Sequence, residues 1–173
     1  MPDPVVREVP QGLPILDAHR FDPAHRRRLG GPGLRTFLNI ADAWKLSEQE
    51  RLHVLGLPAR STFYGWVDKA HRRKEITLAV DQLTRISAVL GIYKALRIIF
   101  SHDEDAAKWL RSPNKGIIFG GQPPLSLITS GAQDTLISVR RYLDAWRGGM
   151  FAEPVPGFDD KVAPMSEDDL VFA

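Results

Sequence analysis

The feature that most constrains the fold is a helical pattern over residues 77–100 whose apolar side chains cover nearly every face. One face repeats apolar residues at steps of three and four, and Val89, Ile92 and Ile98 fill the others. A helix that is apolar nearly all round must be covered by several neighbours or by a second subunit. Gly91 within it predicts a kink or a close crossing, at a cost of about 1 kcal/mol relative to alanine. The pattern therefore predicts a helical bundle.

No segment shows convincing strand periodicity, and Ile117–Phe119 offers at most one short extended piece. We therefore expect an all-α protein. Apolar residues make up 43% of the 173 residues and charged residues 25%, which is typical of soluble globular proteins. No apolar run approaches the roughly 18 residues needed to cross a membrane, and prolines interrupt the start of the chain where a signal peptide would be apolar. We expect a cytoplasmic protein without membrane contact.

The residue types that carry catalysis or bind metals form no recognisable motif. Without cysteine the chain has no disulfides, no thiolate nucleophile and no cysteine-ligated zinc. The five histidines show no H-E-x-x-H spacing, and neither a P-loop nor a G-x-S-x-G turn occurs. Asp103–Asp105 suits a helix start better than a pair of catalytic carboxylates. We predict that the protein is not an enzyme and holds no metal or cofactor.

Residues 34–70 predict three short helices, of which the last two form a helix-turn-helix. The first carries an apolar face from Leu34 to Trp44, at steps of three and four. Ser47–Glu50 then forms a capping box for the second helix, which Gly56 is placed to end. Ser61 is a good N-cap for the third helix, whose apolar face runs from Phe63 to Ala70. The same pattern occurs in αα-corners that do not bind DNA.

The remaining face of the third helix carries side chains suited to DNA contact. They are types that bind base edges and phosphates, and the basic run at 71–74 follows directly. The candidate DNA-binding residues are Arg60, Ser61, Thr62, Tyr64, Lys69, Arg72 and Arg73. The alternative interpretation is a solvated basic corner.

Charge is distributed unevenly along the chain. The net charge is +2, but residues from Gly148 onward sum to −5, so the first 147 residues carry +7. A basic body suits contact with nucleic acid, whereas the acidic tail aids solubility, docks on a basic partner or competes with DNA. Six prolines before Gly33 argue against a stable element there. Within that segment His25–Arg28 is either a solvated run or an arm for DNA phosphates.

The second half predicts two more helices around a turn region. Residues 101–104 read as a second capping box, opening a helix that ends before Pro113. Residues 116–128 are rich in glycine and proline yet apolar, so they either fold back on a core or face a partner. The last helix follows Gly131 and ends at Gly148.

Residues 34–147 resemble the Xre/MbcA/ParS-type antitoxins. The resemblance is most specific where Trp109-Leu110, the FGGQPPL turn at 119–125 and the VRRYL segment at 139–143 follow one another in this order. The first half matches as a generic helix-turn-helix. The proline-rich start and the acidic tail have no counterpart in the resemblance.

The resemblance implies an N-terminal helix-turn-helix (Xre-like) bundle that represses its own operon, followed by a small helical toxin-binding domain. Family members of this type are encoded beside RES-domain toxins, which degrade NAD, and form homodimers within larger toxin–antitoxin complexes. By position, Ser61, Thr62 and Tyr64 fall on the recognition helix. The residues carried over to the toxin-binding region are Phe119, Gly120, Gln122, Pro123, Leu125, Arg140 and Tyr142.

We therefore expect a flexible arm (1–33), a DNA-binding domain with a dimerising helix (34–100), a toxin-binding domain (101–149) and an acidic tail (150–173). The tail would occlude the toxin if a carboxylate took the place of a dinucleotide phosphate in a basic pocket. One alternative is a helix-turn-helix transcriptional regulator whose C-terminal half senses a ligand or dimerises. Another is an adaptor without DNA activity. A RES-type reading frame directly alongside the gene would favour the antitoxin.

Overall fold

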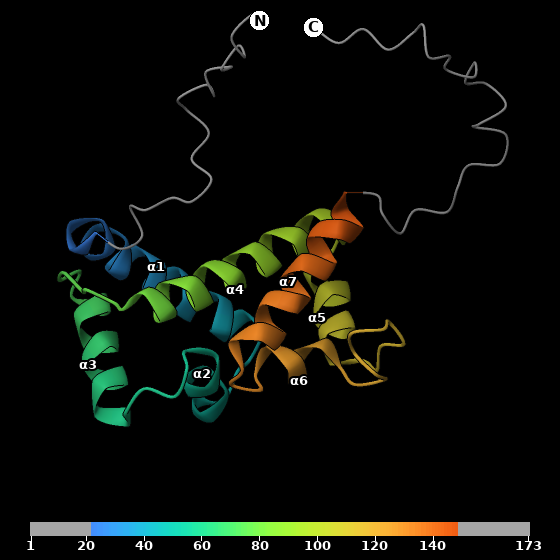
Figure 1. The fold of residues 1–173 in the computed structure, drawn as a ribbon, viewed down its shortest axis with the longest axis horizontal. Coiled ribbons are helices and arrows are strands. Elements are labelled where there is room, and N and C mark those ends of the chain that lie inside the picture. Colours follow the sequence, from blue (N-terminus) through green and yellow to red (C-terminus); the bar gives the residue numbers. More distant parts are fainter. Residues whose placement is uncertain (1–21, 149–173) are drawn as a thin grey trace, which may run out of the picture.

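The computed structural model describes residues 22–148, which form seven α-helices and no strand (Figure 1). The all-α expectation is thus confirmed for this part of the chain. The helices are α1 (Pro23–Ala43), α2 (Glu48–Val54), α3 (Arg60–His71), α4 (Val80–Ile99), α5 (Asp103–Arg111), α6 (Pro124–Ile128) and α7 (Gln133–Arg147). The first residues of the expected arm and the expected acidic tail lie outside the described residues.

Helix α4 lies at the centre, packed against α1 on one side and α7 on the other (Figure 1). Its buried side chains include Ile86, Val89, Ile92 and Leu96, which share one broad face of the helix, and partly buried Leu83 and Leu90 pack against the core beside that face. These contacts cover most of the apolar side chains of the segment, whereas Ile98 is exposed. Helix α3 occupies one end of the molecule, and α5 and α6 occupy the other.

Helix α1 begins at Pro23, eleven residues before the first residue that follows the expected arm. Its first turn is capped by Asp22, whose carboxylate accepts a 3.0 Å hydrogen bond from the backbone N–H of Ala24. Pro23 occupies the first helical position, where a backbone N–H has no partner within the helix and proline is well tolerated. The expectation of no stable element before Gly33 was therefore wrong.

The glycines of this segment allow a close crossing. A Cβ atom on Gly30 would lie 1.9 Å from the backbone oxygen of Ile76, in the segment that leads into α4. In the same contact, Arg26 donates a 3.0 Å hydrogen bond to the carbonyl oxygen of Leu78. Because glycine has no side chain, the backbone of residues 76–78 can approach the helix closely at this point.

Several polar contacts join the two halves of the molecule. The Arg85 guanidinium is buried and donates to the backbone oxygens of Gly131 at 2.9 Å and Val54 at 3.5 Å. His53 Nδ1 lies 3.1 Å from the backbone oxygen of Thr129. Because one apolar core also runs through α1, α4 and α7, the helix-turn-helix and the C-terminal helices form one packed body.

Three local expectations for the second half need correction. Helix α5 has His102 at its N-cap with no side-chain hydrogen bond, so residues 101–104 form no capping box. Residues 117–121 form turns and not an extended piece. The short helix α6 was not anticipated, because its five residues are too few to show a helical period.

Candidate functional sites

The connection between α2 and α3 is a tight turn with two consecutive residues in the left-handed region. Gly56 has φ +81° and Leu57 has φ +58°. Upstream, Ser47 and Glu50 form the expected capping box, with Ser47 N donating to Glu50 Oε2 at 2.7 Å and Glu50 N donating to Ser47 Oγ at 3.3 Å. Ser61, however, is not the N-cap of α3, because the helix already starts at Arg60 with Ala59 at the cap.

Helix α3 is anchored by one face and exposes the other. Phe63 and Ala70 are buried, and Trp66 and Val67 pack partly against the core, as the apolar pattern predicted. All seven candidate DNA-binding residues are exposed. Five of them lie on α3, and Arg72 and Arg73 follow its last residue. These side chains are accessible along the solvent-facing part of α3 and directly after its end, and we call this set the α3 surface (Arg60, Ser61, Thr62, Tyr64, Lys69, Arg72 and Arg73).

Carboxylates accompany several cations of the α3 surface. Glu48, the first residue of α2, accepts a 2.5 Å hydrogen bond from the Tyr64 hydroxyl and lies 3.4 Å from Arg60 Nε. Asp68 pairs with Arg72 at 2.8 Å. The hydrogen bond to Glu48 raises the pKa of Tyr64 above its ordinary value, with smaller contributions from burial and from the Glu48 charge. The surface is therefore less positive than its arginines alone suggest.

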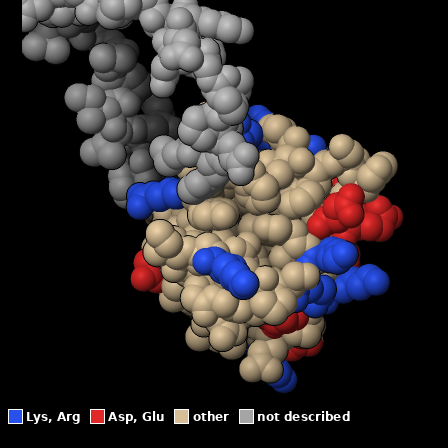
Figure 2. Space-filling model, turned by 90° about the vertical axis from the view of Figure 1, so that its right-hand side faces the viewer, with Lys and Arg blue, Asp and Glu red and all other residues tan. Residues whose placement is uncertain are grey.

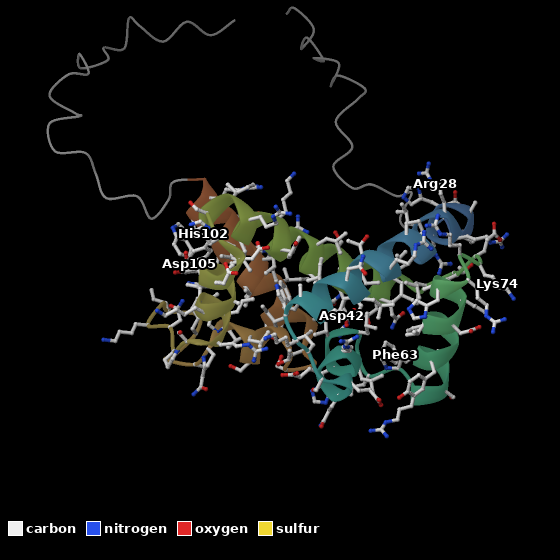
Figure 3. All side chains as sticks on the ribbon, turned by 180° about the vertical axis from the view of Figure 1, so that it is seen from behind. Arg28, Asp42, Phe63, Lys74, His102 and Asp105 are labelled. Carbon is white, nitrogen blue, oxygen red and sulfur yellow. The ribbon has the colours of Figure 1, made fainter. Side chains whose placement is uncertain are left out.

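A second set of cations lies beside α3. Arg28, on the first turns of α1, and Lys74, after α3, project from the same end of the molecule, far from His102 and Asp105 at the opposite end (Figure 3). Arg28 is exposed, although one of its guanidinium nitrogens lies 3.1 Å from His25 Nδ1. The basic cluster at 25–28 is thus part of a helix next to the α3 surface.

Residues 114–122 form a compact loop, which we call the 114–122 loop, closed by backbone hydrogen bonds. Asn114 N donates to Gln122 O at 3.3 Å, and Gly121 N donates back to Asn114 O at 3.0 Å. The Asn114 side chain accepts a 2.8 Å bond from Gly116 N. Gly120 and Gly121 take positive φ values of +56° and +82°, which glycine adopts without strain.

Phe119 fixes this loop to the body of the protein. Its ring is buried and contacts Trp109 and Tyr142 edge-to-face, with ring centroids 5.8 Å and 4.9 Å apart. The side chain of Leu125, in α6, is also buried. Both residues had been assigned to the toxin-binding region by position, and in this structure their side chains face the core.

The other residues carried over to the toxin-binding region do not form one cluster. Gly120 and Gln122 are exposed on the loop, and Pro123 is half-buried beside it. Tyr142 contacts the loop through Phe119. Arg140 instead reaches α4, donating a 2.9 Å hydrogen bond to the backbone oxygen of Ser87. Side chains two residues apart on a helix point in different directions, so α7 carries Tyr142 and Arg140 on separate faces.

Gly91 is where Arg140 crosses α4. A Cβ atom on Gly91 would lie 2.5 Å from Arg140 Cζ, so the glycine makes room for the guanidinium group. The expected close crossing is therefore present. Arg140 also lies 3.4 Å from Asp144 in an ion pair along α7. Beside it, Leu29, Leu83 and Ile137 line an open groove of about 480 Å³ between α1, α4 and α7.

Sequence reasoning missed the most exposed apolar residue of the 114–122 loop. Ile117 is 99% exposed, and Ile118 next to it is 38% exposed. Figure 2 views this end of the molecule, where most of the surface is uncharged and several charged side chains gather along one edge. The glycines and apolar residues of the segment indicated an apolar turn, but only the fold shows that Phe119 points inward while Ile117 points outward.

The described residues contain no group of His, Asp and Glu that could hold a metal ion. Over the same residues, no helix is long and apolar enough to span a bilayer.

Comparison with known proteins assigns both halves of the chain. Residues 23–91 match the model of the antitoxin Xre-like helix-turn-helix domain, and residues 95–149 match that of the antitoxin Xre/MbcA/ParS C-terminal toxin-binding domain. The chain is also 41% identical over 116 residues to an uncharacterized protein, y4oB, of Sinorhizobium fredii, covering 67% of this chain and 84% of that protein. No solved structure matches.

Proposed function

Because the chain belongs to the Xre/MbcA/ParS family of antitoxins, we propose that it neutralises a RES-domain, NAD-degrading toxin and binds the operator DNA of its own operon. The matches to a helix-turn-helix domain and to a toxin-binding domain support a toxin and DNA as partners. The identity of the toxin as a RES-domain enzyme rests on the sequence resemblance. The proposal includes a homodimer within a larger complex, and mass measurement of the co-expressed complex tests it.

The 114–122 loop is the observation that carries the toxin-binding part of the proposal. It lies within the matched toxin-binding domain and presents the apolar side chain of Ile117 to solvent. Backbone hydrogen bonds and the buried Phe119 ring hold its shape before any partner arrives. A loop that is already ordered loses little conformational entropy on binding, so more of its contact energy appears as affinity. We propose that the loop covers the mouth of the toxin's active site and excludes NAD.

The toxin-binding proposal is tested by changing Ile117→Asp in the full chain and co-expressing it with the RES-type toxin gene that the proposal places beside its own. A buried charge in place of an apolar anchor should weaken the complex at least about 30-fold, as for an interface hot spot. The readouts are the dissociation constant and the protection of cellular NAD.

Leu57→Asp is the matched control for Ile117→Asp. Leu57 is also exposed, at 63%, but lies in the α2–α3 turn. Leu57→Asp makes the same chemical change in the other half of the molecule, so it should leave the protection of cellular NAD unchanged. Equal loss of protection by both variants, or by neither, would remove the loop from the proposed interface.

The DNA-binding part of the proposal places α3 in the major groove. The exposed polar face of α3 and the cations that follow it support this placement. Replacing Arg60, Tyr64 and Arg72 together by alanine should weaken binding to the promoter of its own gene. It should also flatten the salt dependence, since each lost phosphate contact reduces the slope by about 0.9. Undiminished binding at moderate salt would show that α3 is not the recognition helix.

The alternative function is a transcriptional regulator whose C-terminal half senses a ligand or dimerises. The groove of about 480 Å³ between α1, α4 and α7 favours this reading, because its size suits a small molecule and its walls are mostly apolar. A RES-type reading frame beside the gene, together with a stable complex of the two products, would favour the antitoxin over the regulator.

A further inference from the structure

Glu48 is a carboxylate beside the α3 surface whose role the proposed function leaves unexplained. It is the first residue of α2, but the cap of that helix is completed by Glu50 and not by Glu48. Its side chain instead reaches across to α3. There its Oε2 accepts the hydrogen bond from Tyr64, and its Oε1 faces Arg60 Nε. One carboxylate thus engages two residues of the α3 surface.

The geometry makes Glu48 a restraint that DNA can displace. Arg60 and Tyr64 lie one helical turn apart, so both reach the same carboxylate from one edge of α3. The Arg60 side chain is 75% exposed and that of Glu48 is 40% exposed. Exposed ion pairs of this kind are weak, so a DNA phosphate competes with Glu48 for the guanidinium group.

We propose that Glu48 is a positioning residue that sets the sequence specificity of DNA binding: it orients Arg60 and Tyr64 toward the bases and withholds Arg60 from the phosphates of unmatched DNA. Nonspecific binding comes almost entirely from neutralised phosphates, and a carboxylate at the interface opposes it on every sequence. Base-edge contacts by correctly held side chains form only on a matching sequence. Glu48 therefore lowers nonspecific affinity more than specific affinity. This inference rests on the proposed DNA-binding function.

The test compares Glu48→Gln with the wild type, both as the full chain. Each is titrated with a duplex from the promoter of its own gene and with a scrambled duplex of equal length, over a series of salt concentrations. With the carboxylate gone, affinity for the scrambled duplex should rise about two- to fivefold, and its salt slope should steepen by about 1 as Arg60 gains a phosphate. The ratio of promoter to scrambled affinity should fall.

Asp42→Asn is the matched control, because it removes the same charge from a neighbouring carboxylate. Asp42 is 67% exposed and pairs with Arg51 at 2.6 Å, on α1 and α2. Arg51 stays tied to the backbone oxygen of Leu46 at 3.0 Å without it. This variant should leave the affinity ratio and the salt slope unchanged. If it lowers the ratio as much as Glu48→Gln does, Glu48 acts only through net charge and the proposal is overturned.

Two further outcomes separate this inference from the function on which it rests. A wild type that prefers its promoter, with a ratio unaltered by Glu48→Gln, would overturn the role of Glu48 while leaving DNA binding intact. A wild type that binds neither duplex would overturn both. Thermal unfolding of each variant shows whether it is folded at the assay temperature.

Discussion

The α3 surface and the 114–122 loop differ in what holds their shape. Helix α3 is regular, is anchored by buried Phe63, and offers charged side chains whose partners are other exposed side chains. The loop is irregular, is closed by its own backbone and Asn114, and offers an apolar tip. Attraction between charges tolerates small shifts but is screened by salt, whereas apolar contact depends on fit. The proposed DNA contact should therefore respond to salt and the proposed toxin contact to geometry.

The largest expected effect comes from removing the ring that supports each surface. Phe119→Ala and Phe63→Ala both empty a buried site, so each should lower the free energy of unfolding by about 3–5 kcal/mol. Denaturant unfolding measures the loss. Among molecules still folded at low temperature, Phe119→Ala should lose toxin binding more than promoter binding, and Phe63→Ala the reverse. Parallel losses in both variants would mean that the two surfaces are not independent.

Arg85 links the two regions, and its replacement tests how far they stay coupled. Arg85→Met keeps the length of the side chain but leaves the backbone oxygens of Gly131 and Val54 without their donor. The free energy of unfolding should fall by about 2 kcal/mol. If Arg85 aligns the α2–α3 turn with the α6–α7 connection, promoter affinity and toxin affinity should both weaken. A stability loss with both affinities unchanged would reduce Arg85 to a structural contact.

Two glycine-to-alanine substitutions, one in each region, should change the stability of the protein in opposite directions. Gly121 has φ +82°, so Gly121→Ala should cost about 1–2 kcal/mol of stability and distort the loop. Gly65 lies within α3, is exposed, and has no atom within 4 Å of the position of a Cβ. Gly65→Ala should therefore raise stability by about 0.5–1 kcal/mol. Differential scanning calorimetry checks both, and the same sign in both variants would contradict these conformations.

Gly65→Ala also sharpens the proposal for α3. If the helix lies deep in the major groove, a methyl group at this position should weaken promoter binding even though the free protein is more stable. Opposite changes in stability and affinity would identify a close approach of DNA to the helix backbone. Improvement in both would mean that Gly65 stays clear of DNA.

The smallest effect is the titration of Tyr64. Since its hydrogen bond to Glu48 raises the pKa of the hydroxyl, Tyr64 should lose its proton above pH 10. The stabilising contribution of this bond is complete below the unfolded-state pKa of about 10 and disappears as pH rises through the higher folded-state pKa. NMR of ring-labelled tyrosine measures the titration. Glu48→Gln should lower the Tyr64 pKa, and an unchanged value would show that the hydrogen bond is absent in solution.

The two regions also differed in how much could be predicted. The capping box at Ser47 and the apolar face of α3 are local patterns, and both are present as expected. In the loop, the apolar sequence indicated that some residues pack on the core or contact a partner, but it did not indicate which residues do so. Phe119 and Ile117 are two residues apart and equally apolar, yet one is buried and the other exposed. The difference depends on Trp109 and Tyr142, which are distant in sequence.

By itself, the sequence determined the helical class, the order of the main helices and the antitoxin family. Helical periodicity, caps and family motifs are patterns of residues that lie close together in the sequence. The tertiary structure decided the features that depend on contacts between segments far apart in the sequence. At the proline- and glycine-rich start of α1, the backbone near Ile76 packs on Gly30, and Arg140 lies against α4 where Gly91 leaves room for it. Whether a glycine breaks a helix or admits a neighbour depends on the neighbour, which no local pattern contains.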